Sequence, residues 1–488
     1  MKWFISRSSL PLFWGILASF TVFQNTQCLP TSPTQSGPMT LNQTIGLLSS
    51  YAKFLKEWKT LYSSQKEILL SILNYERPEI LRDLKVTKDV DLYNYLIDVS
   101  LFQMNKLEDI RSQSQNVALR DSLVQHVRKV IHRNQNPKEC RDIEVIAYDP
   151  QSICGFGCQI HHIAYCLTTA LGEGKPLLVK ASPWHNFDSI FDLIMPLSEN
   201  CHYDMIETHN LTAKHIRLKY EYHVAEFLPP IYPENIGELI DEFSTEPFVW
   251  YIAQIIMYIL RFRPNMMNHV KPIELPSPIV GVHVRRTDKL WGEAKCYRIE
   301  EYMKYVELYY RKLEQKSKVS TKNVYLATDD QQIIDEFRQK YPDYNFITSN
   351  VEYTADRFSH PGTFSILSDI YHLAKSDHLV CTFSSNICRL AYEWMNGQKA
   401  DGTEDYYSVD DIYFYARQKD STYSLHLDHT AGDRLIDTKA RVYLITTLFE
   451  RYRTVRFADT PDEYKVPGYK LRENPMYKNF KAFENMEL

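Results

Sequence analysis

Short apolar segments alternate with helical patterns through residues 274–415, and this alternation constrains the fold more than any other feature of the chain. The expected strands are rich in β-branched residues and span 280–284, 324–327, 346–347 and 379–382. Helical patterns lie between or after them at 299–314, 331–340, 364–375 and 385–396. Strand and helix in alternation predict a parallel, doubly wound sheet of Rossmann type. No Gly-x-Gly-x-x-Gly motif opens this sheet, which argues against an ordinary dinucleotide site.

The first of these strands runs directly into a cluster of charge, His-Val-Arg-Arg-Thr-Asp-Lys at residues 283–289. Strand alternation places His283 and Arg285 on one face and Arg286 on the other. Ligands of open α/β sheets bind outside the carboxyl ends of the strands, and a guanidinium suits phosphate oxygens. The segment therefore predicts a site for a nucleotide diphosphate. The alternative is a structural arginine pair bonded to Asp288 and nearby carbonyl groups, and spacing alone does not separate the two.

The rest of the chain indicates a second α/β region and no nucleic-acid partner. Residues 143–273 alternate apolar runs such as 177–179 with helical stretches such as 249–263, which predicts a first α/β half. At 488 residues the chain exceeds the size of one core, so more than one domain is expected. The formal net charge is only −5, and no basic field suits nucleic acid.

The N-terminus predicts a secretory-pathway address. Residues 10–23 are apolar and follow Lys2 and Arg7, and no small-x-small cleavage site follows them. A cytosolic tail over 1–7 and an uncleaved type II anchor over 8–24 are therefore favoured over a cleaved signal peptide, with the remainder lumenal. In that compartment nine cysteines predict a disulfide framework, and sequons at Asn42 and Asn210 predict glycosylation.

Between the anchor and the first α/β half the sequence predicts a stem and then helices. Residues 25–41 are polar and rich in proline, and residues 42–135 carry helical stripes such as Leu92, Tyr95, Leu96 and Val99. Such stripes pack on a neighbour in the same chain or, in the alternative, form a parallel coiled-coil dimer. The only Asp-x-Asp motif of the chain, residues 89–91, is of the type that holds metal in many sugar-nucleotide transferases. Here it is expected to open a helix instead.

Five strings of the sequence resemble, in order and at compatible spacing, those of the eukaryotic α1,6-fucosyltransferases, which core-fucosylate N-glycans. They are residues 135–140 (QNPKEC), 154–159 (CGFGCQ), 283–289 (HVRRTDK), 326–330 (LATDD) and 381–385 (CTFSS). The resemblance implies a GT-B-like open α/β domain over 136–273 and a Rossmann-type donor-binding half over 274–415. It also implies a helical dimerisation region over 42–135 and a divergent SH3-like β tail over 416–488.

The resemblance further implies an inverting transfer of L-fucose from GDP-β-L-fucose to the 6-hydroxyl of the innermost Asn-linked GlcNAc. No metal or other cofactor is expected, because a fixed arginine cation takes the place of a metal ion. The expected partners are GDP-fucose, an N-glycan acceptor on glycoproteins and a second copy of the chain, at the Golgi membrane.

Site residues are carried over from the family position by position. Arg285 matches the arginine that binds the β-phosphate, and Ser385 would add a hydroxyl and a helix N-terminus. Asp369 and His283 match guanine contacts, and Phe156 replaces a family tyrosine and so lacks its hydroxyl. Glu293 matches the catalytic base and Lys289 the lysine beside it. The remaining donor-site or catalytic matches are Arg286, Asp288, Tyr302, Asp329 and Asp330.

Several of these residues have a structural alternative. Ser385 and the pair Asp329-Asp330 could merely cap helices, and Asp369 could lie on a helix surface. Glu293 could be a solvated loop residue paired with Lys289. The resemblance to the family, and not the residue pattern, favours the functional roles.

Disulfide pairings are likewise implied by the resemblance: Cys140–Cys201, Cys154–Cys158 and Cys381–Cys388. Two cysteines of the catalytic region, Cys166 and Cys296, remain unassigned, either as a fourth bridge or as two buried free thiols. Cys154 and Cys158 with the following His161-His162 have zinc-like spacing, but an oxidising lumen argues against a zinc site.

Two other functions remain open at the level of sequence. One is a fucosyltransferase that acts on another acceptor. The other is a catalytically silent glycan- or nucleotide-binding relative, suggested by the divergence of the tail.

Overall fold

The structure, a computed structural model, describes residues 89–112, 117–150, 155–216, 247–286, 296–351, 356–399, 402–410 and 413, and parts of 55–73 and 232–246. The chain divides into two compact units. One comprises residues 1–115 and 438–455, and the other comprises 116–437 and 456–488. The anchor, stem and tail predicted at 8–24, 25–41 and 416–488 lie outside the described residues, as does the cytosolic tail at 1–7.

In the first unit, α4 (Asp89–Ser112) packs with helical residues between 55 and 73. Trp58 donates from Nε1 to the Leu107 carbonyl at 2.6 Å, and its ring stacks on Tyr62. The buried stripe of α4 consists of Ile97, Leu101, Met104 and Leu107. Tyr95, which the sequence placed in the buried stripe, is instead 63% exposed. The buried face of α4 thus differs in phase from the predicted stripe, whose Leu96 and Val99 are only half-buried.

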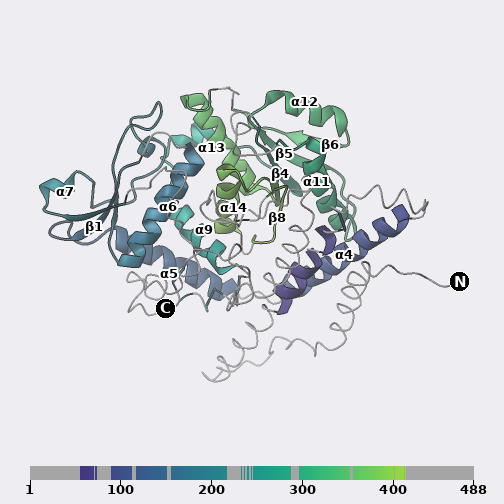
Figure 1. The fold of residues 1–488 in the computed structure, drawn as a ribbon, viewed down its shortest axis with the longest axis horizontal. Coiled ribbons are helices and arrows are strands. Elements are labelled where there is room, and N and C mark those ends of the chain that lie inside the picture. Colours follow the sequence, from purple (N-terminus) through teal and green to yellow (C-terminus); the bar gives the residue numbers. More distant parts are fainter. Residues whose placement is uncertain are drawn as a thin grey trace, which may run out of the picture. The chain divides into compact units, whose positions relative to one another are not determined.

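The second unit contains a five-stranded parallel sheet with the strand order β6-β5-β4-β7-β8 (Figure 1). The strands are β4 (Ile279–Val284), β5 (Lys322–Thr328), β6 (Tyr344–Ile347), β7 (His378–Cys381) and β8 (Tyr406–Ser408). The helices around them are α11 (Ile299–Glu314), α12 (Gln331–Lys340), α13 (His360–Lys375) and α14 (Asn386–Gln398). This is the predicted doubly wound sheet, in which the strand order reverses between β4 and β7.

Helix α13 begins four residues earlier than the periodicity predicts. The Ser359 hydroxyl accepts from the Gly362 amide at 3.2 Å, and Pro361 lies in the first turn. A serine cap followed by proline is a strong helix start, which the apolar stripe alone does not register.

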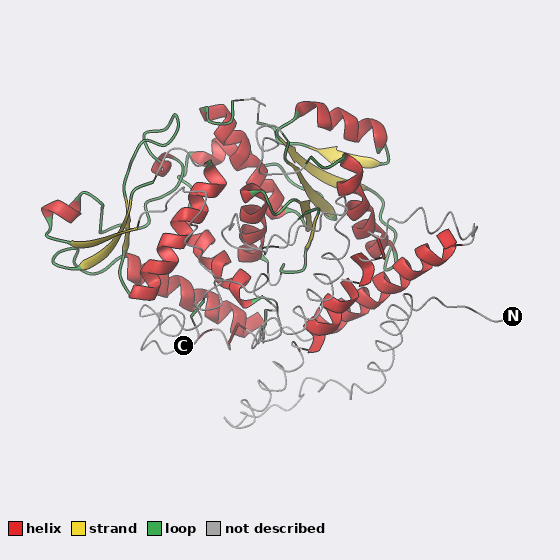
Figure 2. Ribbon diagram, viewed as in Figure 1, coloured by secondary structure: helices red, strands yellow, loops and turns green. Residues whose placement is uncertain are grey.

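The first α/β half of the same unit is a three-stranded parallel sheet with the order β2-β1-β3, shown in yellow in Figure 2. Its strands are β1 (Glu144–Tyr148), β2 (Leu177–Val179) and β3 (Thr212–Ile216). The helices of this half are α5 (Val117–Gln135), α6 (Phe156–Glu173), α7 (Met205–Thr208), α9 (Pro247–Ile259) and α10 (Met266–Val270), with a 3-10 turn at Ile190–Asp192. The expected run at 177–179 is thus a strand, and the helix expected over 249–263 ends at Ile259.

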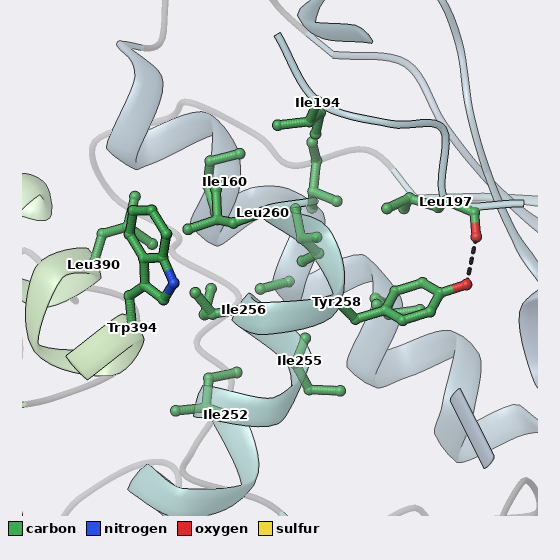
Figure 3. Packing of buried hydrophobic residues seen from close by; sticks show 14 of the residues in the cluster. Ile160, Ile194, Leu197, Ile252, Ile255, Ile256, Tyr258, Leu260, Leu390 and Trp394 are labelled. Atoms are coloured by element: carbon green, nitrogen blue, oxygen red, sulfur yellow. Dashed lines mark hydrogen bonds between the residues drawn. The ribbon is translucent and has the colours of Figure 1, made fainter. Parts of the chain in front are cut away.

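The main core of this unit lies among α5, α6, α9, α13 and α14, which sit between the two sheets (Figures 1 and 2). Helix α9 is apolar on nearly all sides, as a buried helix should be. In Figure 3 Ile160 of α6 and Trp394 of α14 lie on the same side of α9, close to Ile256. On the other side, the Tyr258 hydroxyl of α9 donates to the Leu197 carbonyl at 2.7 Å. The core therefore joins the two α/β halves into one body.

Candidate functional site

The site predicted from the sequence lies where the order of the five-stranded sheet reverses. Crevices outside the carboxyl ends of strands at such a reversal bind ligands in open α/β proteins. Strand β4 ends at Val284 and is followed by Arg285, and β7 ends at Cys381 and is followed by Ser384 and Ser385. The two strands pair directly, so these residues meet at one edge of the sheet.

Arg285 is buried at this edge, with 4% of its surface exposed. Its Nη1 forms an ion pair with Asp329, which follows β5. Asp329 also accepts a hydrogen bond from the Arg286 backbone amide at 2.8 Å. A buried guanidinium must be paired, and this carboxylate both balances its charge and orients it. Asp329 is thus a partner of Arg285 and not merely a helix cap.

His283 is buried beside Arg285 and remains neutral at ordinary pH. Burial and the Arg285 charge lower the pKa of its imidazole to about 3. Its Nδ1 is buried and makes no hydrogen bond within the residues that the structure describes. An unpartnered buried nitrogen of this kind is suited to a polar group of a ligand.

Two hydroxyls complete the β7 side of the edge. Ser385 is the residue before α14, but its side chain does not cap the helix, contrary to the structural alternative. The hydroxyls of Ser384 and Ser385 are both buried and, within the described parts of the chain, without a hydrogen-bond partner. The Ser384 amide donates to Asp410, after β8, at 3.4 Å. Asp410 was not singled out from the sequence, because β8 is too short to be recognised.

Asp369 lies on α13, where it is half-buried, and its carboxyl reaches the sheet. The Tyr325 hydroxyl of β5 donates to its Oδ1 at 2.9 Å. Burial raises the pKa of this carboxyl to about 7, although the tyrosine bond acts in the opposite direction. The carboxyl is therefore bonded to the sheet and not, as in the alternative, solvated on the helix surface.

Three further predicted residues occupy distinct places. Tyr302 of α11 is fully buried, and burial together with the Asp410 charge raises the pKa of its phenol. Asp330 accepts from the Gln332 amide at 3.1 Å and caps α12, which is its structural alternative. Phe156, at the start of α6, is buried edge-on against Trp184, with 6.2 Å between ring centroids.

The predicted base and its neighbours, Glu293, Lys289 and Asp288, lie outside the described residues. Both flanks of their segment are described. The Arg286 guanidinium donates from Nη2 to the Tyr297 carbonyl at 3.1 Å, which ties the two flanks together next to Arg285. The segment that carries these three residues therefore begins and ends at the site.

The structure joins Cys140 to Cys201 and Cys381 to Cys388, as the resemblance implies. Cys158 is disulfide-bonded, and Cys154, its expected partner, is outside the described residues. Cys166 and Cys296 are free, so a fourth bridge between them is wrong. The alternative of two buried thiols is also wrong for Cys296, which is exposed at the end of the loop, whereas Cys166 is buried in α6.

Within the described ranges, no group of three or more His, Cys, Asp and Glu side chains could hold a metal ion. Asp89 of the Asp-x-Asp motif opens α4, as expected. No helix in the part of the chain that is described is both long and apolar enough to span a bilayer. Of the two sequons, Asn42 is not described and Asn210 is exposed in a turn before β3.

Known proteins of one family are similar to this chain over both α/β halves. The family model for the N- and catalytic domains of alpha-(1,6)-fucosyltransferases matches residues 60–414. An alpha-(1,6)-fucosyltransferase of Drosophila melanogaster is 35% identical over 309 residues, which cover 60% of this chain and 50% of the relative. One of Caenorhabditis elegans is 29% identical over 400 residues, which cover 76% of this chain and 70% of the relative. The chain thus spans half the length of the fly relative.

Among solved structures, a NodZ alpha-1,6-fucosyltransferase soaked with GDP-fucose is 15% identical, with a TM-score of 0.32. That match covers 51% of this chain and 92% of the other. The match of the family model, which includes both sheets and every strand described above, is decisive: the chain belongs to the alpha-(1,6)-fucosyltransferase family.

Proposed function

We propose that this protein transfers L-fucose from GDP-β-L-fucose to the 6-hydroxyl of the innermost Asn-linked GlcNAc of N-glycans, with inversion at the anomeric carbon. Membership of the family supports the reaction type. The observation that carries the proposal is the buried Arg285–Asp329 pair at the reversal of the sheet. A permanently charged, oriented cation at that place suits a diphosphate.

The reaction needs stabilisation of the departing diphosphate and a base for the incoming hydroxyl. In the proposed mechanism Arg285 binds the β-phosphate, whose charge grows as the glycosidic bond breaks. The unpartnered hydroxyl of Ser385, at the start of α14, adds a hydrogen bond to the same group. Because Arg285 supplies the positive charge, we propose that no metal is required.

The base is proposed to be Glu293, oriented by Lys289, with Asp288 beside them. These roles rest on the family motif and on the placement of both flanks of the segment at Arg286 and Tyr297. A carboxylate next to a lysine can accept the hydroxyl proton while it stays oriented.

The guanine is proposed to bind between Asp369 and His283. Guanine offers two neighbouring N–H donors, which a single carboxylate can accept. Asp369 is turned inward and already accepts from Tyr325, and the Nδ1 atom of His283 is buried nearby on the same half. Phe156, Tyr302, Arg286 and Asp330 are proposed to shape the rest of the donor site.

We further propose a single-pass type II protein of the Golgi membrane, with a lumenal catalytic domain that dimerises through residues 42–135. The apolar segment at 8–24 and the disulfides Cys140–Cys201 and Cys381–Cys388 support an oxidising lumenal address. Asn42 and Asn210 are then glycosylation sites, and the side chain of Asn210 is exposed in its turn.

Product mass tests the function. Purified chain, incubated with GDP-fucose and a defined N-glycan, should yield a product heavier by one fucose on the innermost GlcNAc, located by fragmentation. Fucose on another residue would indicate a different acceptor specificity. Binding of GDP without any product would indicate a catalytically silent relative.

A further inference from the structure

Two helices from different halves of the second unit begin at the same place. Helix α6 starts at Phe156, and α14 starts at Asn386, directly after Ser385. A Cβ atom on Gly157 would lie 3.1 Å from the backbone carbon and oxygen of Asn386 and from the side chain of Ile387. The two helix starts are therefore in backbone contact, and each carries one residue of the proposed donor site.

A buried polar bridge holds the same two helices together one to two turns further along. His161 of α6 lies with Nε2 2.9 Å from Oε2 of Glu393 on α14, and with Nδ1 3.2 Å from Oδ1 of Asn386. The other carboxylate oxygen of Glu393 accepts from the Tyr413 hydroxyl at 2.7 Å. Glu393 has no exposed surface, and the His161 side chain is only 7% exposed. One oxygen of this wholly buried carboxylate thus joins α14 to α6, and the other is held by Tyr413.

Apolar packing already joins α6 to α14, so a buried acid is not needed for cohesion alone. A buried ion pair often stabilises no more than an apolar pair of the same shape. The bridge adds a fixed relative position of the two helices. A hydrogen-bonded carboxylate limits how far one helix can slide or turn along the other. That register sets the distance between Phe156 and Ser385.

We infer that His161 and Glu393 are positioning residues for donor binding: they fix α6 against α14 so that the two helix starts converge on the nucleotide. Neither residue is among those proposed to contact the nucleotide. The inference rests on the proposed function only in that the ligand of this edge is taken to be GDP.

The test compares His161→Gln and Glu393→Gln with Tyr258→Phe in the full chain. The control removes a buried hydrogen bond of the same core, from Tyr258 of α9 to the Leu197 carbonyl (Figure 3). This bond involves neither His161 nor Glu393. Calorimetry with GDP, well below the lowest melting temperature of the set, and KM and kcat for GDP-fucose are the measurements. All three variants should melt at a lower temperature. Only the two bridge variants should bind GDP more weakly, on the order of tenfold, with KM changed more than kcat.

If the bridge variants fail to fold, Gly157→Ala is the second test. It removes no polar group and pushes α14 away by a few tenths of an ångström, so it should weaken GDP binding in the same way. Wild-type affinity for GDP in the folded bridge variants, or in Gly157→Ala, would overturn the inference while the proposed function stands. Absence of GDP binding by the wild-type chain would overturn both.

Discussion

Each of the two parallel sheets has an ion pair directly after two neighbouring strands, but the pair is exposed in one sheet and buried in the other. In each sheet, neighbouring parallel strands end in register, and the next residue of one strand is a cation and that of the other a carboxylate. In the three-stranded sheet these are Lys180 and Asp149, 2.9 Å apart and both 48% exposed. In the five-stranded sheet they are Arg285 and Asp329, with side chains 3% and 11% exposed. The topology alone therefore does not make a site, and burial separates the two edges.

The two ion pairs differ in their access to water. Water screens the Lys180–Asp149 pair, and exposed pairs of this kind contribute little to stability. Arg285 and Asp329 lose most of their hydration on folding. Their mutual attraction offsets this desolvation cost only in part. A cation that is kept buried at the reversal of a doubly wound sheet is better explained by a charged ligand than by stability.

The largest expected effect is at Arg285. Arg285→Ala should lower both GDP affinity and turnover, with turnover falling by at least about 10³-fold, because the diphosphate is present in the ground state and gains charge in the transition state. The variant also leaves Asp329 without its cation, so the free energy of unfolding should fall by roughly 3 kcal/mol. Steady-state kinetics, GDP calorimetry and denaturant melts measure these changes.

Lys180→Ala is the matched control for that variant. It should change neither GDP affinity nor the melting temperature measurably, because its pair is exposed. Arg285→Lys keeps a charge without the guanidinium fork and should fall between the two. Equal effects of Arg285→Ala and Lys180→Ala would break the comparison.

Next in size is the separation of chemistry from binding at Glu293. Glu293→Gln should leave GDP binding nearly intact while turnover falls by about 10²–10⁴-fold, the usual range for a general base. Single-turnover transfer and calorimetry on the same variant are the measurements. If it transfers fucose at the wild-type rate, or loses GDP as Arg285→Ala does, the base must be sought at Asp288 or Asp329.

A smaller effect is expected from the titration of Asp369. Its pKa is about 7, so the carboxyl is mostly protonated at pH 6 and mostly ionised at pH 8. Only the ionised form accepts both N–H donors of guanine, so GDP affinity should rise with pH, by about tenfold from pH 6 to pH 8. Calorimetry across this range measures it. The GDP phosphate titrates nearby, so Asp369→Asn is the control: its pH dependence should be clearly weaker, and an unchanged slope would contradict the role of Asp369.

The smallest expected effect is that of chelation. If Arg285 supplies the positive charge at the diphosphate, EDTA should leave the rate of transfer unchanged. Loss of transfer in EDTA that added Mn²⁺ restores would show that Arg285 does not act alone.

Much of the five-stranded half could be predicted from the sequence because its signals are local. Four of the six residues of strand β4 are β-branched, and α11 has a clear apolar stripe, so both were found within a residue or two. Strand β8 has only three residues, Tyr406–Ser408, and pairs with a strand 25 residues earlier in the chain, so no local pattern marks it.

The sequence names candidate residues for the site but not how they pair. Arg285 and Asp329 are 44 positions apart, and only the register of β4 and β5 brings them together. The hydrogen bond from Tyr325 to Asp369 depends on how α13 packs on β5, and residues next to Asp369 in the sequence do not reveal it. The same holds for His161 and Glu393, which the sequence gives no reason to connect.

The central claim is that the buried edge between β4 and β7, and not the exposed edge of the other sheet, holds the nucleotide. A crystal structure of the full chain with GDP tests it most directly. The account predicts the diphosphate against Arg285 and Ser385, with the guanine at Asp369. A diphosphate bound at Lys180, or any bound GDP that leaves Arg285 untouched, would contradict it.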